Sequence, residues 1–198
     1  MNNQLQLMKS LFAFVLLLLI GCKPKSTEPE KKFISLVSLI ESQVAHVDTS
    51  LYAIIKIVST DSTHHDTTFI RREDFRKEAS EFLDIPDLSN PKIAKRYKEE
   101  PARYDELMGR VIISYSAIDP GKEEFKNQEL LVTPNLASGD KINNIITTRV
   151  ISNKDSFVQK NMLWRMDKSF QVTTILQKPG GFEKVTTSRV VWNDDELQ

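Results

Sequence analysis

The stretch FVQKNMLWRMDKSFQVTTILQ, residues 157–177, decides the fold. Its apolar side chains alternate with polar ones on both sides of a charged centre, and this period of two is that of a β-strand with one buried face. Two such strands with a short connection pair in antiparallel fashion. The apolar set before the turn is Val158, Met162, Trp164 and Met166, and the set after it is Phe170, Val172 and Leu176.

The loop length sets the register of this predicted hairpin. A three-residue loop at 167–169 would pair Met166 with Phe170 and place both apolar sets on one face, whereas a two-residue loop would place them on opposite faces. Burial therefore favours the longer loop. The other face would be polar, as in a sheet with one side in water; it would carry Gln159, Asn161, Arg165, Gln171, Thr173 and Gln177.

The same strand pattern recurs on both sides of the hairpin. Short turns rich in Gly, Pro, Asn and Asp separate the segments, and short connections force antiparallel neighbours. The sequence therefore predicts a β-meander from residue 110 onward. The segments are RVIISYSAI at 110–118, QELLVT at 128–133, NIITTRVIS at 144–152, the two strands already described, and EKVTTSRVVW at 183–192.

The region before the meander reads as helices mixed with one further hairpin. Apolar residues at helical spacing predict an amphipathic helix over 31–47. A strand over 51–59 and a second over 67–70 flank a polar tip at 61–66. A helix follows over 72–84, and Asn90-Pro91 is a typical helix start. We therefore expect an α+β fold, in which the N-terminal amphipathic helix and short helices pack on one face of a mostly antiparallel β-meander sheet.

The most apolar segment of the chain is LFAFVLLLLI, residues 11–20. A bilayer-spanning helix needs about 20 apolar residues, so this run is too short. Lys9 before it and Gly21 after it are typical of a secretory signal peptide. The end of this run and the two residues after it, Leu19-Ile20-Gly21-Cys22, resemble the lipobox of bacterial lipoproteins. That resemblance implies cleavage before Cys22 and attachment of lipid to its sulfur; several acyl chains anchor a protein stably to a membrane.

The domain organisation follows from this segment. We expect 1–21 to be a cleaved signal peptide, 22–32 to be the acylated Cys22 with a flexible tether, and 33–198 to be a single α+β domain. The tether prediction rests on KPKSTEPEKK, residues 23–32, which has two prolines and no large apolar residue. Lys23 in place of Asp favours the outer membrane by analogy with bacterial sorting, so the protein would face the periplasm or the cell surface.

Few residues suggest chemistry. The 27 basic and 27 acidic residues balance, which argues against a nucleic-acid partner. Asp61, His64, His65 and Asp66 could offer nitrogen and oxygen ligands to a metal. Adjacent strand residues diverge, however, and a solvated tip lacks groups that orient the ligands, so we favour a polar turn. We expect neither a metal nor any other cofactor.

The sequence also lacks a recognisable catalytic pattern. Cys22, the only cysteine, is taken by the lipid, and there is no G-x-S-x-G motif for a serine nucleophile. We therefore predict that the chain is not an enzyme. Trp164 shares a face with apolar neighbours and should be core. Trp192, near the end of the last strand, is a weak candidate for a binding platform that stacks on sugars.

The leading functional hypothesis is a membrane-anchored lipoprotein of the cell envelope that acts as a non-catalytic binding or accessory module, with an envelope protein as its partner. The mature domain also resembles envelope lipoproteins of unknown function, and this resemblance implies no activity. One alternative is a carrier of lipid or another apolar ligand, which requires a cavity between sheet and helices. Another is a periplasmic hydrolase, which requires titratable groups with perturbed pKa values in a cleft.

Overall fold

The computed structural model describes residues 33–51, 53–60 and 64–193. The chain divides between Lys32 and Phe33, and the second unit is the folded domain described below. The expected signal peptide, the lipid site Cys22, the tether and Asp61 lie outside the described residues. Within the described residues, no helix is both long enough and apolar enough to cross a membrane.

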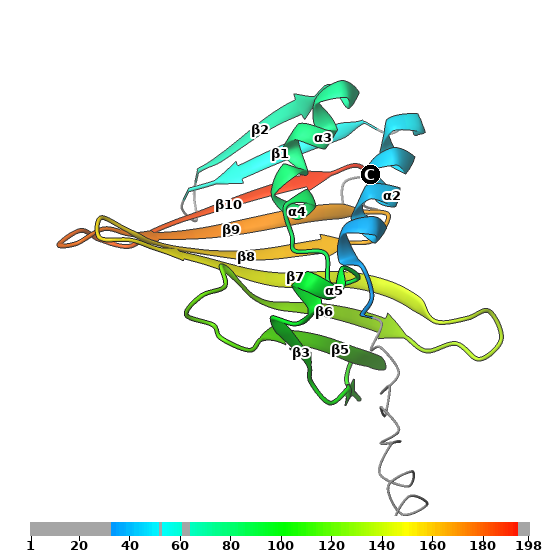
Figure 1. Ribbon diagram of the computed structural model, residues 1–198. Helices are drawn as coiled ribbons and strands as arrows, with labels where there is room; N and C mark the ends of the chain where they lie inside the picture. The colour runs from blue at the N-terminus through cyan, green and yellow to red at the C-terminus, as the bar shows by residue number, and fades with distance from the viewer. Residues whose placement is uncertain (1–32, 52, 61–63, 194–198) are drawn as a thin grey trace, which may run out of the picture. The chain divides into compact units, whose positions relative to one another are not determined.

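An antiparallel sheet of ten strands forms the body of the domain (Figure 1). Its order is β2-β1-β10-β9-β8-β7-β6-β5-β3, and β4 also pairs with β5. The six strands from β5 to β10 follow one another as the predicted meander. The strands are β1 Ile54–Ser59, β2 His65–Ile70, β3 Tyr97–Glu99, β4 Arg103–Asp105, β5 Arg110–Ala117, β6 Phe125–Thr133, β7 Lys141–Ser152, β8 Phe157–Arg165, β9 Ser169–Gln177 and β10 Lys184–Val191.

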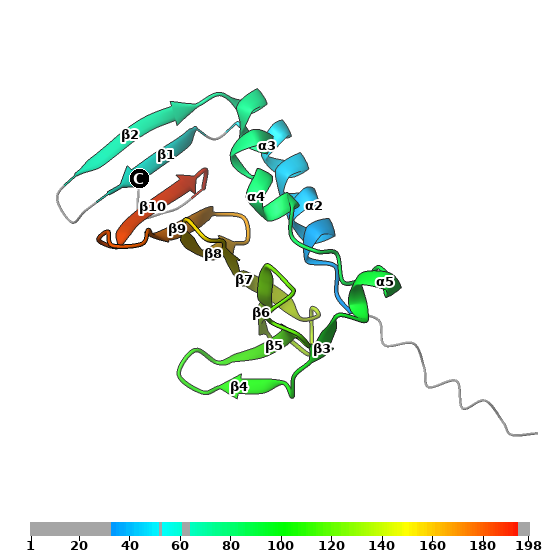
Figure 2. The same ribbon diagram turned by 60° about the vertical axis from the view of Figure 1, so that its left-hand side comes forward.

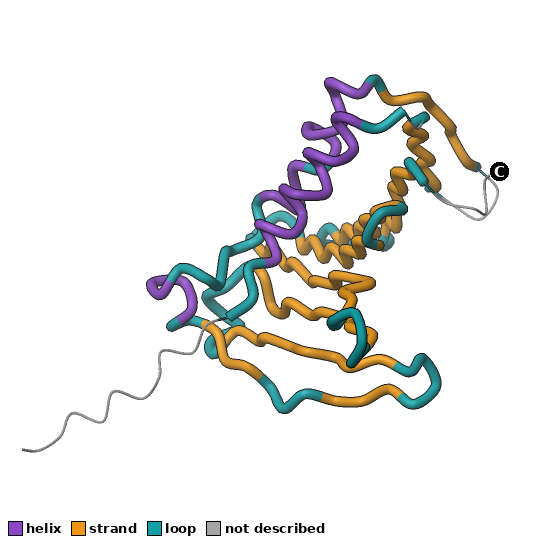
Figure 3. Tube along the Cα trace, turned by 90° about the vertical axis from the view of Figure 1, so that its right-hand side faces the viewer, coloured by secondary structure: helices purple, strands orange, loops and turns teal. Residues whose placement is uncertain are grey.

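The helices lie together on one face of this sheet, which confirms the predicted α+β class (Figures 1 and 3). Ser35 caps α2, since its side chain accepts a hydrogen bond from the Ser38 amide. The predicted helix over 72–84 is three short turns, and Asn90 caps the last helix as expected. The helices are α2 Leu36–Thr49, η1 Arg72–Asp74, α3 Phe75–Glu78, α4 Ser80–Leu83 and α5 Pro91–Ala94.

An aromatic cluster fills the space between the helices and the sheet. Trp164 of β8 stacks on Phe170 of β9 with ring centroids 5.1 Å apart, and Phe82 of α4 meets the Trp164 ring edge-on at the same distance. Phe75 of α3 packs edge-on against Trp192, again at 5.1 Å. All five side chains are at most 3% exposed. Rings in these arrangements contribute both buried area and favourable pair geometry.

The register of the central hairpin differs from the prediction by two residues. Trp164 pairs with Phe170 and Arg165 with Ser169, so the predicted pair of Met166 with Phe170 is wrong. The connection is three residues long, as expected, but it runs over 166–168. Asp167 adopts a left-handed φ of 63° there. Because a shift of two residues preserves parity, the apolar sets still share the helix-covered face.

Two features of the sheet have no counterpart in the predictions. The short strands β3 and β4 extend it beyond β5, and the hairpin β1–β2 joins it beside β10 through pairs such as Ile55 with Val191. Figure 2 shows the consequence: the sheet curves, and the hairpins β1–β2 and β4–β5 both reach out on the helix-free side. We call this side the open face.

Candidate functional site

A pocket of about 330 Å³ lies at the end of the sheet where β8 finishes and β7 begins. Arg165 alternates with Trp164, which faces the helices, so Arg165 points to the open face. Asn144 is the cross-strand partner of Arg165 and points the same way. The pocket is lined by Arg110 of β5, by Lys141, Asn143 and Asn144 of β7, by Arg165 of β8, and by Met166 and Lys168 of the β8–β9 turn.

The β8–β9 turn is held in place from two directions. On one side, the buried Gln43 of α2 donates to Asp167 Oδ1 at 2.9 Å and accepts from the Asp167 amide at 2.6 Å. On the other side, the Lys168 carbonyl accepts from the backbone amides of Trp192 at 3.0 Å and Asn193 at 3.2 Å. The turn that carries two lining residues is therefore fixed to a helix and to the end of the last strand.

The start of β7 is fixed in a similar way. The Asn143 carbonyl accepts from the Met166 amide at 2.9 Å, and the Asn143 side chain accepts from Thr133 Oγ1 at 2.9 Å. The pairing of β6 with β7 slips by one residue between Leu131 and Val132. Such a bulge lets consecutive residues reach the same side of a strand, and here Asn143 and Asn144 both line the pocket.

Electrostatically the pocket is one-sided. Four of its seven lining residues are Arg or Lys, and none is Asp or Glu. Acidic residues lie close by: Asp105 is the cross-strand partner of Arg110, and Asp140 and Asp167 adjoin Lys141 and Lys168 in the sequence. Each also accepts a hydrogen bond, from the Met108 amide, the Asn135 amide and Gln43 respectively. The lining itself combines four cationic side chains with two side-chain amides.

Three of the four weak metal candidates, His64, His65 and Asp66, lie within the described residues and do not form a common site. His65 pairs with Ser59, and their side chains contact each other with 2.7 Å between His65 Nδ1 and Ser59 Oγ. Asp66 is the next residue of β2, so its side chain points to the opposite face. His64 directly precedes the strand. Within the part of the chain that the structure describes, no group of three or more His, Cys, Asp or Glu side chains could hold a metal ion.

Trp192, the weak candidate for a binding platform, is buried. It is 3% exposed and lies in the aromatic cluster, with its ring centroid 5.5 Å from that of Trp164. A buried ring offers no free face for stacking, so the structure does not support Trp192 as a platform. The residue follows β10 immediately, and its apolar ring completes the core where the strand meets α3.

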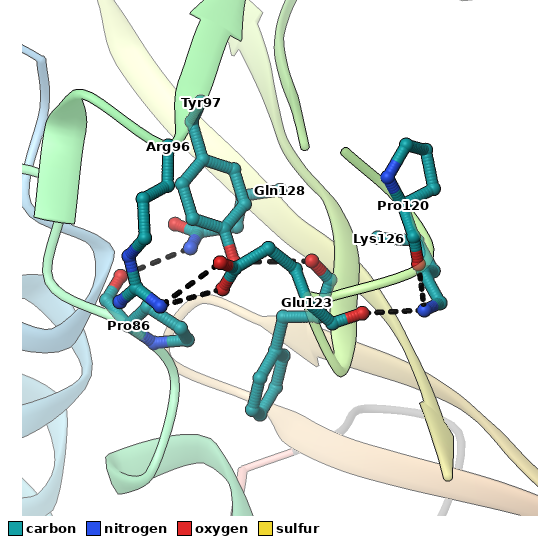
Figure 4. Close-up of polar contacts among 8 residues, drawn as sticks. Pro86, Arg96, Tyr97, Pro120, Glu123, Lys126 and Gln128 are labelled. Atoms are coloured by element: carbon teal, nitrogen blue, oxygen red, sulfur yellow. Dashed lines mark hydrogen bonds and ion pairs between the residues drawn. The ribbon is translucent and has the colours of Figure 1, made fainter. Parts of the chain in front are cut away.

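A second polar cluster lies under β3 and β6 (Figure 4). Arg96 forms an ion pair with Glu123 through two contacts of 3.0 and 2.8 Å, and the Tyr97 hydroxyl donates to the Phe125 carbonyl at 3.0 Å. The fully buried Gln128 donates to the Pro86 carbonyl at 2.9 Å, while its Oε1 has no partner. Nearly all of these polar groups are satisfied by one another, so the cluster fastens the edge of the sheet to the segments around Pro86 and Glu123.

Perturbed pKa values occur away from the pocket. Burial raises the pKa of Tyr97 to about 12, and the nearby Glu123 charge adds to the effect. Burial also raises the pKa of Tyr115. The Lys98 ammonium and the Ser116 hydroxyl lower the pKa of Glu100. These groups lie on β3, β5 and the turn after β3, and none of them lines the pocket.

The pocket residues were not recognised from the sequence. Arg110 and Lys141 are far in the chain from each other and from the pair Arg165 and Lys168, and each is an ordinary charged residue at a strand end or turn. The signal that could have found them is their position at strand ends. Adjacent antiparallel strands bring the start of one beside the end of the next, so basic residues at the start of β5, the start of β7 and the end of β8 lie at the same end of the sheet.

Comparisons with protein families, with curated proteins and with solved structures found no match.

Proposed function

We propose that the chain is a lipid-anchored protein of the cell envelope whose folded domain is a non-catalytic binding or accessory module that uses the pocket between β5, β7 and the β8–β9 turn. The anchor is the lipid on Cys22, and the lipobox-like Leu19-Ile20-Gly21-Cys22 supports it. Two or more acyl chains give stable membrane attachment.

The observation that carries the binding role is the fixed frame of the pocket. Gln43 and the backbone amides of Trp192 and Asn193 hold the β8–β9 turn from both sides, and Met166 is tied to Asn143. Sites built on rigid elements keep their side chains in one geometry and lose little entropy when a ligand binds. The volume of about 330 Å³ lies at the small end of the range for ligand pockets.

The packing between sheet and helices bears on the carrier alternative. A carrier of an apolar ligand needs a cavity there, whereas Trp164, Phe170, Phe82, Phe75 and Trp192 fill the centre of this interface. The hydrolase alternative needs a cleft with perturbed titratable groups. The shifted groups Tyr97, Tyr115 and Glu100 lie outside the pocket. Both observations favour a binding module.

Anchoring is tested by cell fractionation of the Cys22→Ala variant. We expect wild-type protein in the membrane fraction and the variant released from it, because the variant lacks the acylated sulfur. The matched control is Ser26→Ala, a change of similar size in the same segment, which should stay with the membrane. A Cys22→Ala variant that remains fully membrane-bound would contradict the lipid anchor.

Use of the pocket is tested by native mass spectrometry of protein isolated from its own cells. We expect a bound mass in the wild type that is lost in Asn144→Trp, because the large ring would occupy the pocket. The control is Asn161→Trp, which changes a residue on the open face of the neighbouring strand β8 and should keep the bound mass. Circular dichroism verifies that both variants fold. A wild type without a bound mass, or a mass that survives Asn144→Trp, would contradict this use of the pocket.

A further inference from the structure

The lining of the pocket specifies a charge. Arg110, Lys141, Arg165 and Lys168 come from β5, β7, β8 and the β8–β9 turn, and all four contribute to one volume of about 330 Å³. A negative group that enters this volume would be attracted by all four side chains. Arginine offers paired donors that match the two oxygens of a carboxylate or phosphate.

The amides add directional donors to this charge. Asn143 uses its Oδ1 to accept from Thr133, which leaves its side-chain nitrogen as the donor end. Asn144 is the direct cross-strand neighbour of Arg165 on the open face. A group with several oxygens can therefore receive hydrogen bonds from strands β7 and β8 at the same time.

We propose that this pocket binds an anionic group, a carboxylate or a phosphate. The proposal rests on the binding function proposed above and adds the chemical class of the ligand. Four cationic side chains and two amides around one small volume carry it.

Two sources can supply such a group. One is a free ligand of the envelope. The other is the chain itself: the Asn193 amide is bonded to the carbonyl of Lys168, a lining residue, and the sequence continues with Asp194, Asp195 and Glu196. The two sources share one chemistry, and their competition is measurable.

The experiment titrates citrate and inorganic phosphate into the full chain, purified from whichever cell fraction holds it. Thermal melting and calorimetry are compared with chloride at equal ionic strength, which controls for screening. They are also compared with the pocket variant below, because phosphate and citrate stabilise any folded protein by exclusion from its surface. We expect citrate or phosphate to raise the melting temperature beyond the chloride effect. Arg110→Gln with Lys141→Gln should weaken binding at least roughly tenfold, through the loss of two charged donors.

The matched control is Lys92→Gln with Lys95→Gln. Both lysines are exposed in or next to α5, and the pair removes the same charge from the molecule. This variant should bind like the wild type. A response that the control loses as fully as the pocket variant would reflect net charge alone and would overturn the proposal.

A third variant separates the two sources. Asp194→Asn with Asp195→Asn and Glu196→Gln removes the carboxylates of the chain's own C-terminal segment. If these occupy the pocket, the wild type responds weakly and this variant binds citrate or phosphate more tightly. If the ligand is free, both bind alike. The absence of a specific response in both proteins overturns the anionic class; a bound mass that Asn144→Trp removes would still leave the binding function standing.

Discussion

At the residue scale, burial raises the pKa of the Tyr97 hydroxyl. Tyr97 is 3% exposed, and its hydroxyl donates to the Phe125 carbonyl beside the ion pair of Arg96 with Glu123. A phenolate there would lose its hydration and face the Glu123 carboxylate, so the pKa rises to about 12. Tyr104, in contrast, is 61% exposed on β4. Tyr104 is therefore a control position for substitutions at Tyr97.

The raised pKa of Tyr97 predicts a loss of stability in alkali. Below about pH 10 the side chain is neutral in both folded and unfolded chains, and its contribution is fully present. Between about pH 10 and about pH 12 the unfolded chain ionises while the folded chain resists, so the free energy of unfolding falls. Tyr97→Phe should remove this component, so that urea unfolding of the variant loses less stability above about pH 10. Tyr104→Phe, at an exposed position, is the control for the substitution itself. An equal alkaline loss of stability in wild type and Tyr97→Phe would contradict the assignment.

At the scale of elements, the contact between α2 and the β8–β9 turn connects the helical layer with the pocket. Gln43 is the buried polar residue of α2, among Leu36, Ile40 and Val44 on the same face. It satisfies both the amide and the carboxylate of Asp167. A helix that otherwise packs through apolar side chains thereby fixes the conformation of a turn.

Gln43→Ala tests this connection. The Asp167 amide and carboxylate would lose their partner; because Asp167 is exposed, water can take its place, and the net loss is that of ordinary hydrogen bonds, about 0.5–1.5 kcal/mol. We expect urea unfolding to show a loss of that size, and any anion affinity of the pocket to fall because Met166 and Lys168 are less firmly held. Ser42→Ala, an exposed change one residue earlier on the same helix, should leave both unchanged. Equal stability of the two variants would mean that the turn needs no support from α2.

The sequence predicted elements where local signals were strong. Turn residues delimited the strands from β5 to β10, and Asn90-Pro91 marked the start of α5. The hairpin register was off by two because the left-handed Asp167 moved the turn one residue earlier, and its partner Gln43 is 124 residues away. Burial alone determines parity and face, whereas the choice of turn depends on contacts that a local pattern does not contain.

At the scale of the whole domain, the first hairpin closes against the last strand. β1 pairs with β10 in register from Ile55 with Val191 to Ser59 with Thr187. The sequence did not predict that β1 would be the partner of β10, since any other half-buried strand could have paired with β10. The pocket was unpredictable for the same reason: its four cations converge only after β5, β7 and β8 are side by side. Long-range pairing of this kind slows folding, because distant segments must meet first.

The β1–β10 pairing also predicts cooperative unfolding of the domain. Trp164 and Trp192 report on one aromatic cluster that contacts β8, β9, α3 and α4. We expect the tryptophan fluorescence and the far-ultraviolet circular dichroism to change at the same urea concentration. The variant Phe82→Leu, which loosens this cluster, should lower both midpoints together. Separate midpoints would mean that the first hairpin and α2 unfold independently of the meander.

The contact at the beginning of the domain has a mechanical consequence. Phe33 meets the Tyr115 ring edge-on at 5.1 Å, and the Ile34 amide donates to the Tyr115 hydroxyl. Tyr115 lies on β5, the strand that begins with the pocket residue Arg110. In the function proposed above, tension between the membrane tether and a ligand in the pocket would be borne in part by β5, which is hydrogen-bonded to β6 on one side and to β3 and β4 on the other. These pairings would hold the pocket end of β5 in place when the start of the domain is pulled.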